Sequence, residues 1–185
     1  MSWNLPLLLT AARIGVIPAI LLLMLQPSLP LRHIAAVLFV LAAVTDWLDG
    51  WLARRWSQTT LFGAFLDPVA DKLLVAVSLV MLLRDRPTDL LALLVAVTIG
   101  REITVSALRE WLAEVGQRAR VAVNQIGKVK TAAQMSAIAL LLWGSPLFGL
   151  PAYTLGLLLL VLAAVLTLWS MLVYLRGAWP YLRGA

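Results

Sequence analysis

Long apolar segments alternate with short breaks along the chain. The segments cover residues 5–25, 31–56, 65–83, 90–112, 121–143 and 153–175. An α-helix needs about 20 residues to cross about 30 Å of hydrocarbon, and each segment is close to that length. Such runs without alternation are helical, because only helices and closed barrels satisfy backbone polar groups in lipid. The pattern therefore predicts an all-α, polytopic membrane protein with six transmembrane helices.

The breaks between the segments contain the residues of turns. Residues 26–30, 86–89 and 144–146 each combine proline with small or polar residues. Because no repeat or low-complexity stretch divides the chain, we expect one six-helix domain over residues 1–185. The composition is 62% hydrophobic and 13% charged, and the charged share is about half the roughly 25% of soluble domains. A water-soluble globular domain is therefore a poor description of this chain.

The charged and special residues exclude several classes of function. The net charge is +6, but basic residues of polytopic proteins gather in cytoplasmic loops, so we expect no nucleic-acid partner. The absence of cysteine excludes disulfides, thiol nucleophiles and cysteine-ligated zinc. The single histidine, His33, cannot form a histidine-rich metal site and is expected at the membrane interface. Arg13 interrupts the first apolar segment, which we therefore expect to stay in the mature protein.

The basic residues also predict the orientation in the membrane. With a cytoplasmic N-terminus, the inside segments hold Arg54, Arg55, Arg109, Arg118, Arg120, Lys128, Lys130, Arg176 and Arg183. The outside segments hold only Arg32, Arg84 and Arg86. This excess predicts that both termini face the cytoplasm. Arg13, Lys72 and Arg101 lie within or at the edge of predicted spans, where a charge costs a few kcal/mol and normally marks a functional cavity.

Four of the nine acidic residues are concentrated in one stretch of the chain. They are Asp46, Asp49, Asp67 and Asp71. The first two are three residues apart and the last two are four apart, so each pair shares one face of a helix. The polar segment 55–62 fits a short connection between two antiparallel helices. We therefore expect the four carboxylates to point into one cleft near the cytoplasmic surface.

Such a cleft predicts a site for two divalent cations. Four carboxylates in a partly dehydrated cleft cannot all stay ionised without compensating charge. All-oxygen ligation favours hard ions such as Mg²⁺ or Mn²⁺ over zinc or copper. Two such ions suit displacement at phosphorus, because they hold phosphoryl oxygens and stabilise the leaving oxygen. Taken alone, Asp67-Pro68 fits equally well an N-cap followed by the first proline of a helix.

Small residues accompany the acidic residues. Gly50 and Ala53 lie on the helix face of the first acidic pair, and Gly63 lies one turn before Asp67. Positions without large side chains allow a nucleotide or diphosphate to approach the backbone. Arg54, one turn after Gly50, is in reach of a phosphate. Glycine also serves helix packing in membranes, which is the competing interpretation.

The whole stretch 46–71 has the pattern D-x2-D-G-x2-A-R-x8-G-x3-D-x3-D. In this it resembles the CDP-alcohol phosphatidyltransferase family. The resemblance implies the six-helix fold of that family and a membrane enzyme, often homodimeric, that transfers a phosphatidyl group from CDP-diacylglycerol to an alcohol and releases CMP. It also implies two Mg²⁺ or Mn²⁺ ions.

Residue roles follow from the same resemblance. Dimetal ligands would be Asp46, Asp49, Asp67 and Asp71, and Asp71 would also be the general base. CDP-binding positions would be Asp46, Asp49, Gly50, Ala53, Arg54, Gly63 and Asp67.

Segments outside the motif resemble the bacterial branch of the family that uses glycerol 3-phosphate. They are 4–6 with Thr10 and Arg13, then 100–103 with 107–110, 127–131 and 166–170. This resemblance implies sn-glycerol 3-phosphate as acceptor and phosphatidylglycerophosphate as product. It also implies a site in the bacterial cytoplasmic (inner) membrane that faces the cytoplasm. Thr10 and Arg13 are possible site residues on the first helix.

Polar residues on the fourth helix independently favour a phosphorylated acceptor. They recur at roughly helical spacing: Thr98, Arg101, Glu102, Ser106 and Arg109. A dianion would be repelled by the carboxylates unless basic side chains bound its phosphate, and arginine can do so with two hydrogen bonds. The expected acceptor-phosphate residues are Arg101, Arg109, Arg118 and Lys128.

Other roles for the basic residues remain open. Arg120 and Lys130 fit equally well a role in topology and attraction to anionic headgroups. Arg101 could instead pair with Glu102 or with the neighbours of Asp71.

The leading hypothesis is an in-line attack at the β-phosphorus of CDP-diacylglycerol, with Asp71 taking the proton of the acceptor hydroxyl. Within the family, inositol phosphate, serine and choline are alternative acceptors. A prenyltransferase with aspartate-rich motifs is another enzyme hypothesis. An ion or proton transporter is the hypothesis from a different class, because intramembrane charges also mark transport pathways. Metal-dependent release of CMP would separate catalysis from transport.

Overall fold

A computed structural model describes residues 5–56, 61–114 and 125–182. These residues form helices that match the six predicted segments: α1 (Leu5–Leu25), α2 (Leu29–Trp56), α3 (Leu61–Asp85), α4 (Asp89–Glu114), α5 (Gln125–Trp143) and α6 (Ala152–Leu182). In the described part of the chain there is no strand beyond a single bridge between Leu147 and Leu150. The prediction of an all-α architecture is confirmed.

Several helix ends differ from the expectation. Helix α3 begins at Leu61 rather than at residue 65, so the connection after α2 is shorter than the predicted 55–62. Helix α6 continues to Leu182 rather than to residue 175. Apolar Leu61 and Phe62, followed by Gly63 and Ala64, let α3 start earlier than the polar residues before them suggested.

Proline 68 lies inside α3 and not at its first position. The N-cap interpretation of Asp67 is therefore wrong. Proline in a helix interior removes one backbone donor and usually bends the helix. The consequence is that Asp67 and Asp71 both belong to the helix, four residues apart, with their side chains on the same face.

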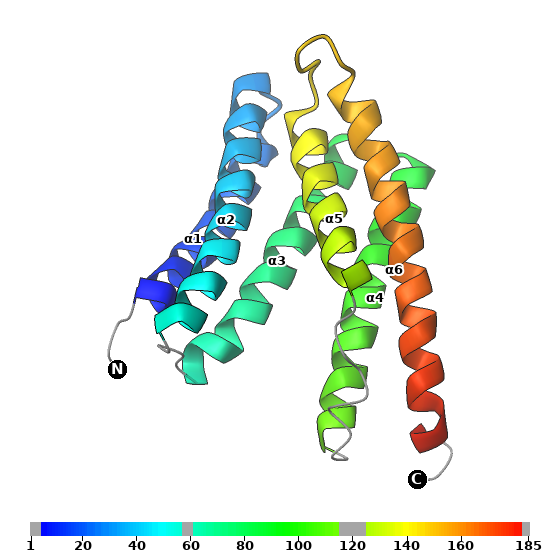
Figure 1. The fold of residues 1–185 in the computed structure, drawn as a ribbon. Coiled ribbons are helices and arrows are strands. Elements are labelled where there is room, and N and C mark those ends of the chain that lie inside the picture. The colour runs from blue at the N-terminus through cyan, green and yellow to red at the C-terminus, as the bar shows by residue number, and fades with distance from the viewer. Residues whose placement is uncertain (1–4, 57–60, 115–124, 183–185) are drawn as a thin grey trace.

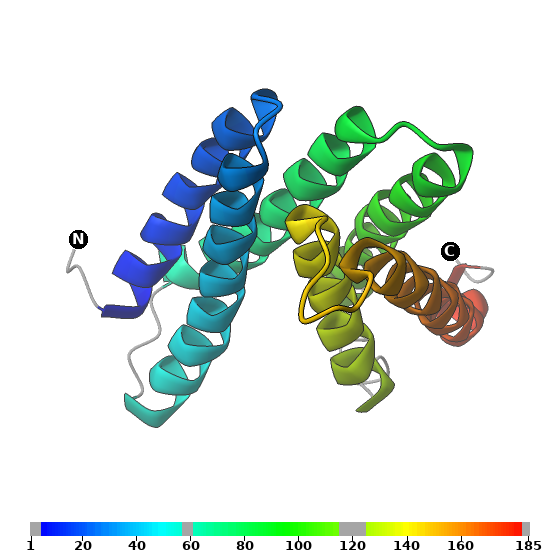
Figure 2. The ribbon, with the colours of Figure 1, turned by 90° about the horizontal axis from the view of Figure 1, so that it is seen from above.

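The helices form two pairs with two helices between them. Helix α1 packs against α2 and α3, while α6 packs against α5 and α4. Figure 1 shows the N- and C-terminal ends at the lower end of the molecule and the α1–α2, α3–α4 and α5–α6 connections at the upper end. Seen from above, α3 and α5 lie between the α1–α2 pair and the α4–α6 pair (Figure 2). The same end that carries both termini therefore also carries the last turns of α2 and the first turns of α3.

The core is apolar, and so is much of the outer surface. Fully buried side chains of the centre include Phe39, Leu79, Ile138, Leu141 and Leu160. Exposed apolar side chains are spread over the helices, as expected where lipid is the solvent. Four described segments are long and apolar enough to cross a membrane: Leu8–Leu25, Leu29–Asp46, Asp89–Glu114 and Ala152–Gly177. The chain is a multi-pass membrane protein.

Arginine side chains connect the helices at the upper end. Arg84 of α3 donates to the carbonyl oxygen of Met24 near the end of α1, over 3.1 Å. Arg32 of α2 donates to the carbonyl of Leu141 near the end of α5, over 3.2 Å, and forms an ion pair with Asp85. Basic side chains at helix C-termini satisfy the last carbonyls and interact favourably with the helix dipole.

His33 lies at the same end, as expected for an interfacial residue. Its ring stacks on Trp143 with centroids 4.0 Å apart, and its Nε2 is 2.9 Å from the hydroxyl oxygen of Ser145. His33 therefore joins the start of α2 to the end of α5.

Two glycines permit close approaches in this half of the molecule. Gly144 ends α5 with φ of 70°, and a Cβ there would lie 2.7 Å from Nη2 of Arg32. Gly156 lets α6 approach α5, since a Cβ would lie 2.9 Å from Cγ of Leu141 and 3.0 Å from the carbonyl oxygen of Ala137. Small residues at helix contacts are typical of membrane bundles.

Candidate active site

Helix α1 supplies two donors to the acidic residues of α2 and α3. The Thr10 hydroxyl donates to Oδ1 of Asp67 over 2.5 Å. One turn later, Nη1 of Arg13 lies 2.8 Å from Oδ1 of Asp46 and 2.8 Å from Oδ1 of Asp71. Thr10 and Arg13 are three residues apart and so share one face of α1. We call Asp46, Asp67 and Asp71 the acidic cluster.

The structure thus brings the acids of two helices to one place. Asp46 belongs to α2 and Asp71 to α3, yet the same nitrogen atom of Arg13 donates to Asp71 and forms an ion pair with Asp46. The Arg13 side chain is fully buried, whereas the side chains of Asp46 and Asp71 are about a third exposed, at 38% and 35%. The carboxylates therefore have one side towards buried Arg13 and another side open to a ligand.

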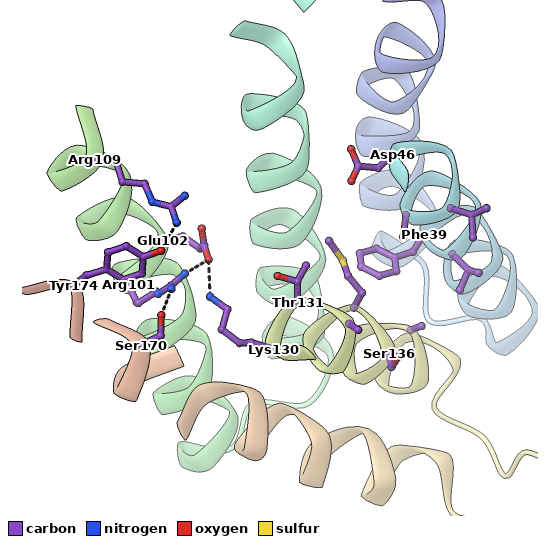
Figure 3. Close-up of a pocket in the computed structure, with 16 residues that line it drawn as sticks. Phe39, Asp46, Arg101, Glu102, Arg109, Lys130, Thr131, Ser136, Ser170 and Tyr174 are labelled. Atoms are coloured by element: carbon purple, nitrogen blue, oxygen red, sulfur yellow. Dashed lines mark hydrogen bonds and ion pairs between the residues drawn. The ribbon is translucent and has the colours of Figure 1, made fainter. Parts of the chain in front are cut away.

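Asp46 also lies at one edge of a cavity of about 940 Å³. Figure 3 shows Asp46 on one side of this cavity and polar side chains from α4, α5 and α6 on the other. Apolar side chains of α2 and α5 line the space between them, including Phe39, Val44 and Met135. Asp46 of the acidic cluster and a second group of polar side chains therefore line opposite walls of one cavity.

That opposite wall is a cluster of charged and hydroxyl side chains. Arg101 donates from Nη1 to Glu102 over 2.7 Å and from Nη2 to the Ser170 hydroxyl over 3.1 Å. The ammonium of Lys130 lies 3.6 Å from the same Glu102 oxygen. Arg101 and Lys130 are both buried. We call Arg101, Glu102, Lys130 and Ser170 the basic cluster, because its two cations share one carboxylate (Figure 3).

One donor of the basic cluster has no partner. Nε of Arg101 is buried and makes no hydrogen bond to the described residues. A buried donor without a partner is costly, so such a group in a cavity fits a site that a ligand completes. An anion would both satisfy the donor and balance the excess positive charge of the cluster.

Arg109 lies at the outer part of the same cavity. Its Nη2 donates to the Tyr174 hydroxyl over 2.7 Å, and its guanidinium carbon lies 5.1 Å from the centre of the Tyr174 ring. The contact orients an otherwise exposed arginine towards the cavity (Figure 3). Tyr174 and Ser170 are four residues apart on α6, so both lie on one face of that helix.

Residues 3–169 match the family described as CDP-alcohol phosphatidyltransferase. The chain belongs to this family. It is 52% identical, over 178 residues that cover 96% of each chain, to the CDP-diacylglycerol--glycerol-3-phosphate 3-phosphatidyltransferase of Escherichia coli (strain K12). The protein of the same name from Shigella flexneri serotype 5b (strain 8401) shows the same identity and coverage. The resemblance inferred from the aspartate motif is confirmed.

Not every motif residue of this CDP-alcohol phosphatidyltransferase is described. Asp49, Gly50, Ala53 and Arg54 lie on the last turns of α2, but their side chains are outside the described residues. Gly63 is buried on α3, four residues before Asp67. Among the side chains that are described, no three histidine, cysteine or acidic residues are placed so that they could hold one metal ion. The side chain of Asp49 lies outside the described residues, so the predicted ligand set stays a prediction.

The acceptor residues predicted for this CDP-alcohol phosphatidyltransferase are placed only in part. Arg101 and Arg109 line the cavity. Lys128 lies on the first turn of α5 with its side chain outside the described residues, and Arg118 and Arg120 are outside them altogether. Of the two partners considered for Arg101, the structure has Glu102.

Some members of the predicted polar face of α4 have other roles. The Ser106 hydroxyl donates back to the Glu102 carbonyl of its own helix, over 2.7 Å. Neither Thr98 nor Ser106 lines the cavity, whereas Arg101, Glu102 and Arg109 do. Three residues of the predicted face therefore contribute to the site, namely Arg101, Glu102 and Arg109.

Three cavity residues were missed or undervalued by the sequence analysis. Lys130 was left evenly balanced between a functional and a topological role, and Ser170 and Tyr174 were given no role. Their signal was the spacing of Ser170 and Tyr174 in an otherwise apolar helix. For Lys130 the sequence carried no such signal, because a basic residue near a helix end equally suits a role in topology.

Proposed function

We propose that this CDP-alcohol phosphatidyltransferase transfers the phosphatidyl group of CDP-diacylglycerol to sn-glycerol 3-phosphate. The products are phosphatidylglycerophosphate and CMP, as in phospholipid biosynthesis. The observation that carries the proposal is the single cavity with Asp46 on one wall and Arg101, Arg109 and Lys130 on the other. The names of the relatives at 52% identity support the same activity.

Two divalent ions, Mg²⁺ or Mn²⁺, complete the acidic end of the site in this proposal. Their ligands are Asp46, Asp49, Asp67 and Asp71. The residues fit such ions, since oxygens of Asp46 and Asp71 already converge on one positively charged nitrogen at 2.8 Å. All-oxygen donors suit hard cations. When bound, the ions supply charge stabilisation to the transferring phosphoryl oxygens and to departing CMP.

Asp71 is the general base of the proposed reaction. Its carboxylate takes the proton of the 1-hydroxyl of glycerol 3-phosphate, whose oxygen then attacks the β-phosphorus of CDP-diacylglycerol. A new phosphorus–oxygen bond forms as the bond between the β-phosphorus and the bridging oxygen breaks, and CMP leaves with that oxygen. The partial exposure of Asp71 supports this role, because a base has to reach the substrate.

The nucleotide is held by the small residues of the motif. Gly50, Ala53 and Gly63 let the cytidine diphosphate approach the backbones of α2 and α3, and Arg54 binds one of its phosphates. Thr10 and Arg13 hold the acidic cluster from α1 through the contacts to Asp67, Asp46 and Asp71.

The phosphate of the acceptor binds to the basic cluster. Nε of Arg101 is buried and makes no hydrogen bond to the described residues, and Lys130 brings a second positive charge to the same cavity. Arg109 closes the outer part of this wall, and Arg118 and Lys128 are further residues that we propose for binding this phosphate. Charge-assisted hydrogen bonds from these cations offset the repulsion between the acceptor and the carboxylates.

The acyl chains of the donor lie against the apolar wall between the two polar ends. Phe39, Val40 and Val44 of α2 and Met135 and Ala139 of α5 line the cavity there. The lipid enters sideways between helices, so both substrates meet at the membrane interface. We place this interface at the cytoplasmic side of the bacterial inner membrane, because the distribution of basic residues along the sequence predicts that both termini face the cytoplasm.

A homodimer is part of the same proposal, since the family resemblance implies one. The exposed apolar side chains of the bundle offer surface both to lipid and to a second copy. Chemical cross-linking of the protein in native membranes tests this assembly separately from the activity.

One assay tests the proposed reaction. Purified protein is incubated with CDP-diacylglycerol, Mg²⁺ and one acceptor at a time, and the lipid product is identified by its mass. We expect phosphatidylglycerophosphate and equimolar CMP with glycerol 3-phosphate. A product only with inositol phosphate or serine would overturn the choice of acceptor. Absence of CMP release with every acceptor would contradict catalysis and would favour a transporter.

A further inference from the structure

Arg13 is a cationic side chain that contacts two of the proposed metal ligands. Its Nη1 lies 2.8 Å from an oxygen of Asp46 and 2.8 Å from an oxygen of Asp71. Through this nitrogen atom, α1 is connected to α2 and to α3 at the same point. The guanidinium is fully buried, so it carries its charge in a place where solvent screens it weakly.

Carboxylates that accept from a guanidinium are already partly neutralised. A divalent ion that used the same oxygens of Asp46 and Asp71 would meet the Arg13 charge at hydrogen-bond distance from its own ligands. Like charges in a site of low dielectric repel each other strongly. Metal binding and the Arg13 contacts therefore oppose each other, although both depend on the same carboxylates.

Without Arg13, the metal-free cluster would have no described cation so close to both carboxylates. The other basic residue nearby in sequence is Lys72, whose side chain is exposed on α3. Loss of an ion pair to a fully buried guanidinium destabilises the fold. Arg13 thus does two things at once: it stabilises the acidic cluster and reduces the net negative charge available to a metal.

We propose that Arg13 is a positioning residue that serves as the cation of Asp46 and Asp71 in the metal-free protein and competes with the metal for their oxygens. The proposal rests on the metal site proposed above. If Arg13 only oriented the metal ligands, its removal would weaken metal binding. Competition predicts the opposite effect on metal affinity. Removal of Arg13 strengthens metal binding while it weakens the metal-free fold.

The test measures binding of Mn²⁺ to the purified protein by electron paramagnetic resonance, without substrate. We compare wild type with Arg13→Gln and with Arg32→Gln, which removes a matched ion pair at the other end of the bundle. Loss of a charged hydrogen-bonding competitor should tighten Mn²⁺ binding by Arg13→Gln about tenfold. Arg32→Gln should leave the affinity unchanged. Unchanged or weaker Mn²⁺ binding by Arg13→Gln would overturn the proposal.

Melting temperatures provide a second readout that does not depend on activity. By linkage, a variant that binds metal more tightly must gain more stability from it. Arg13→Gln should therefore fall far below wild type in EDTA and approach wild type in saturating Mn²⁺. Arg32→Gln should be lowered equally in both conditions. An equal loss for Arg13→Gln in EDTA and in Mn²⁺ would contradict competition and leave Arg13 a packing residue.

A conservative variant covers the case in which Arg13→Gln unfolds. Arg13→Lys keeps one positive charge, so we expect it to fold in EDTA and to bind Mn²⁺ between wild type and Arg13→Gln. Unfolding of Arg13→Gln in EDTA but not in Mn²⁺ supports the proposal, and unfolding in both overturns it unless Arg13→Lys shows the tighter binding. Failure of the metal site itself is recognised separately, because wild type would then bind no Mn²⁺ and would transfer phosphatidyl groups in EDTA.

Discussion

Arginines at the two ends of the bundle have different kinds of partner. At the upper end, Arg32 and Arg84 donate to main-chain carbonyls at the ends of α5 and α1, and Arg32 also pairs with Asp85. At the lower end, Arg13 pairs with two carboxylates, and Nε of Arg101 is buried without a hydrogen-bond partner in the described part of the chain. The upper arginines are paired with groups of the protein itself. In the proposed function, the lower arginines act at groups that also bind ligands.

This difference separates structural from functional charge in a membrane protein. A cation that satisfies helix carbonyls has fixed partners, and its removal should change stability alone. A cation whose partners are carboxylates in an open cavity can exchange them for a substrate or a metal. Both kinds are arginine in a predominantly apolar chain, so the type of residue does not distinguish them. Their partners do.

Removal of divalent metal should have the largest effect at the lower end. With EDTA in excess, we expect transfer from CDP-diacylglycerol to fall below detection, because the proposed ions stabilise the phosphoryl oxygens and the leaving CMP. Added Mg²⁺ or Mn²⁺ should restore it. The measurement is CMP release by purified protein. Transfer that persists in EDTA would contradict the dimetal site.

Substitution of the proposed base, Asp71, should cause the second-largest loss of activity. Asp71→Asn should lower kcat by at least about 100-fold, because general base catalysis typically contributes that much or more. The control is Asp85→Asn at the upper end, which should keep kcat and lower only the melting temperature. Full activity of folded Asp71→Asn would remove Asp71 from the mechanism and weaken the contrast between the two ends.

A substitution in the basic cluster should change the KM of glycerol 3-phosphate more than the KM of CDP-diacylglycerol. Lys130→Met should raise KM for glycerol 3-phosphate by about tenfold or more, because it removes a charged contact to the proposed phosphate. The KM for CDP-diacylglycerol should change little. Arg86→Met, which removes a cation stacked over Tyr153 at the upper end, is the matched control. Equal changes in both KM values would indicate a general loss of structure rather than an acceptor site.

Substitutions at the upper glycines should have the smallest effect on catalysis. Gly156→Ala places a Cβ 2.9 Å from Cγ of Leu141 and 3.0 Å from backbone atoms, and overpacking of this kind costs about 1–3 kcal/mol. We expect a lower melting temperature in detergent with kcat per folded molecule nearly unchanged. Gly100→Ala, where a Cβ has open space, is the control. A large loss of kcat with an unchanged melting temperature would contradict the separation of the two ends.

Much of the fold follows from the apolar segments, because each helix that spans a membrane has to be apolar over most of its length. The ends of the helices follow less well. Pro68 looked like a helix start, yet α3 had already begun at Leu61, because tertiary packing accepts one missing backbone donor inside a helix. The resemblance in residues 46–71 identified the family, since its eight specified residues have fixed spacing.

The site was harder to predict than the fold. Arg13 and Arg101 stood out as charges in apolar segments, but spacing within one helix says nothing about partners on another helix. The contacts of Arg13 to α2 and α3 depend on how three helices pack. Lys130 was undervalued because a basic residue near a helix end equally suits the positive-inside rule. Only its burial beside Glu102 distinguishes the two roles.

The contact at Gly156 has a further consequence for how this chain can change. Leu141 touches that position and lies 11 residues after Lys130 on α5, so this contact and Lys130 are about 16 Å apart along one helix. An insertion of one residue between them would turn Lys130 by about 100° and shift it by about 1.5 Å. The length of α5 between Leu141 and Lys130 therefore tolerates less variation than the identity of the apolar residues along this segment.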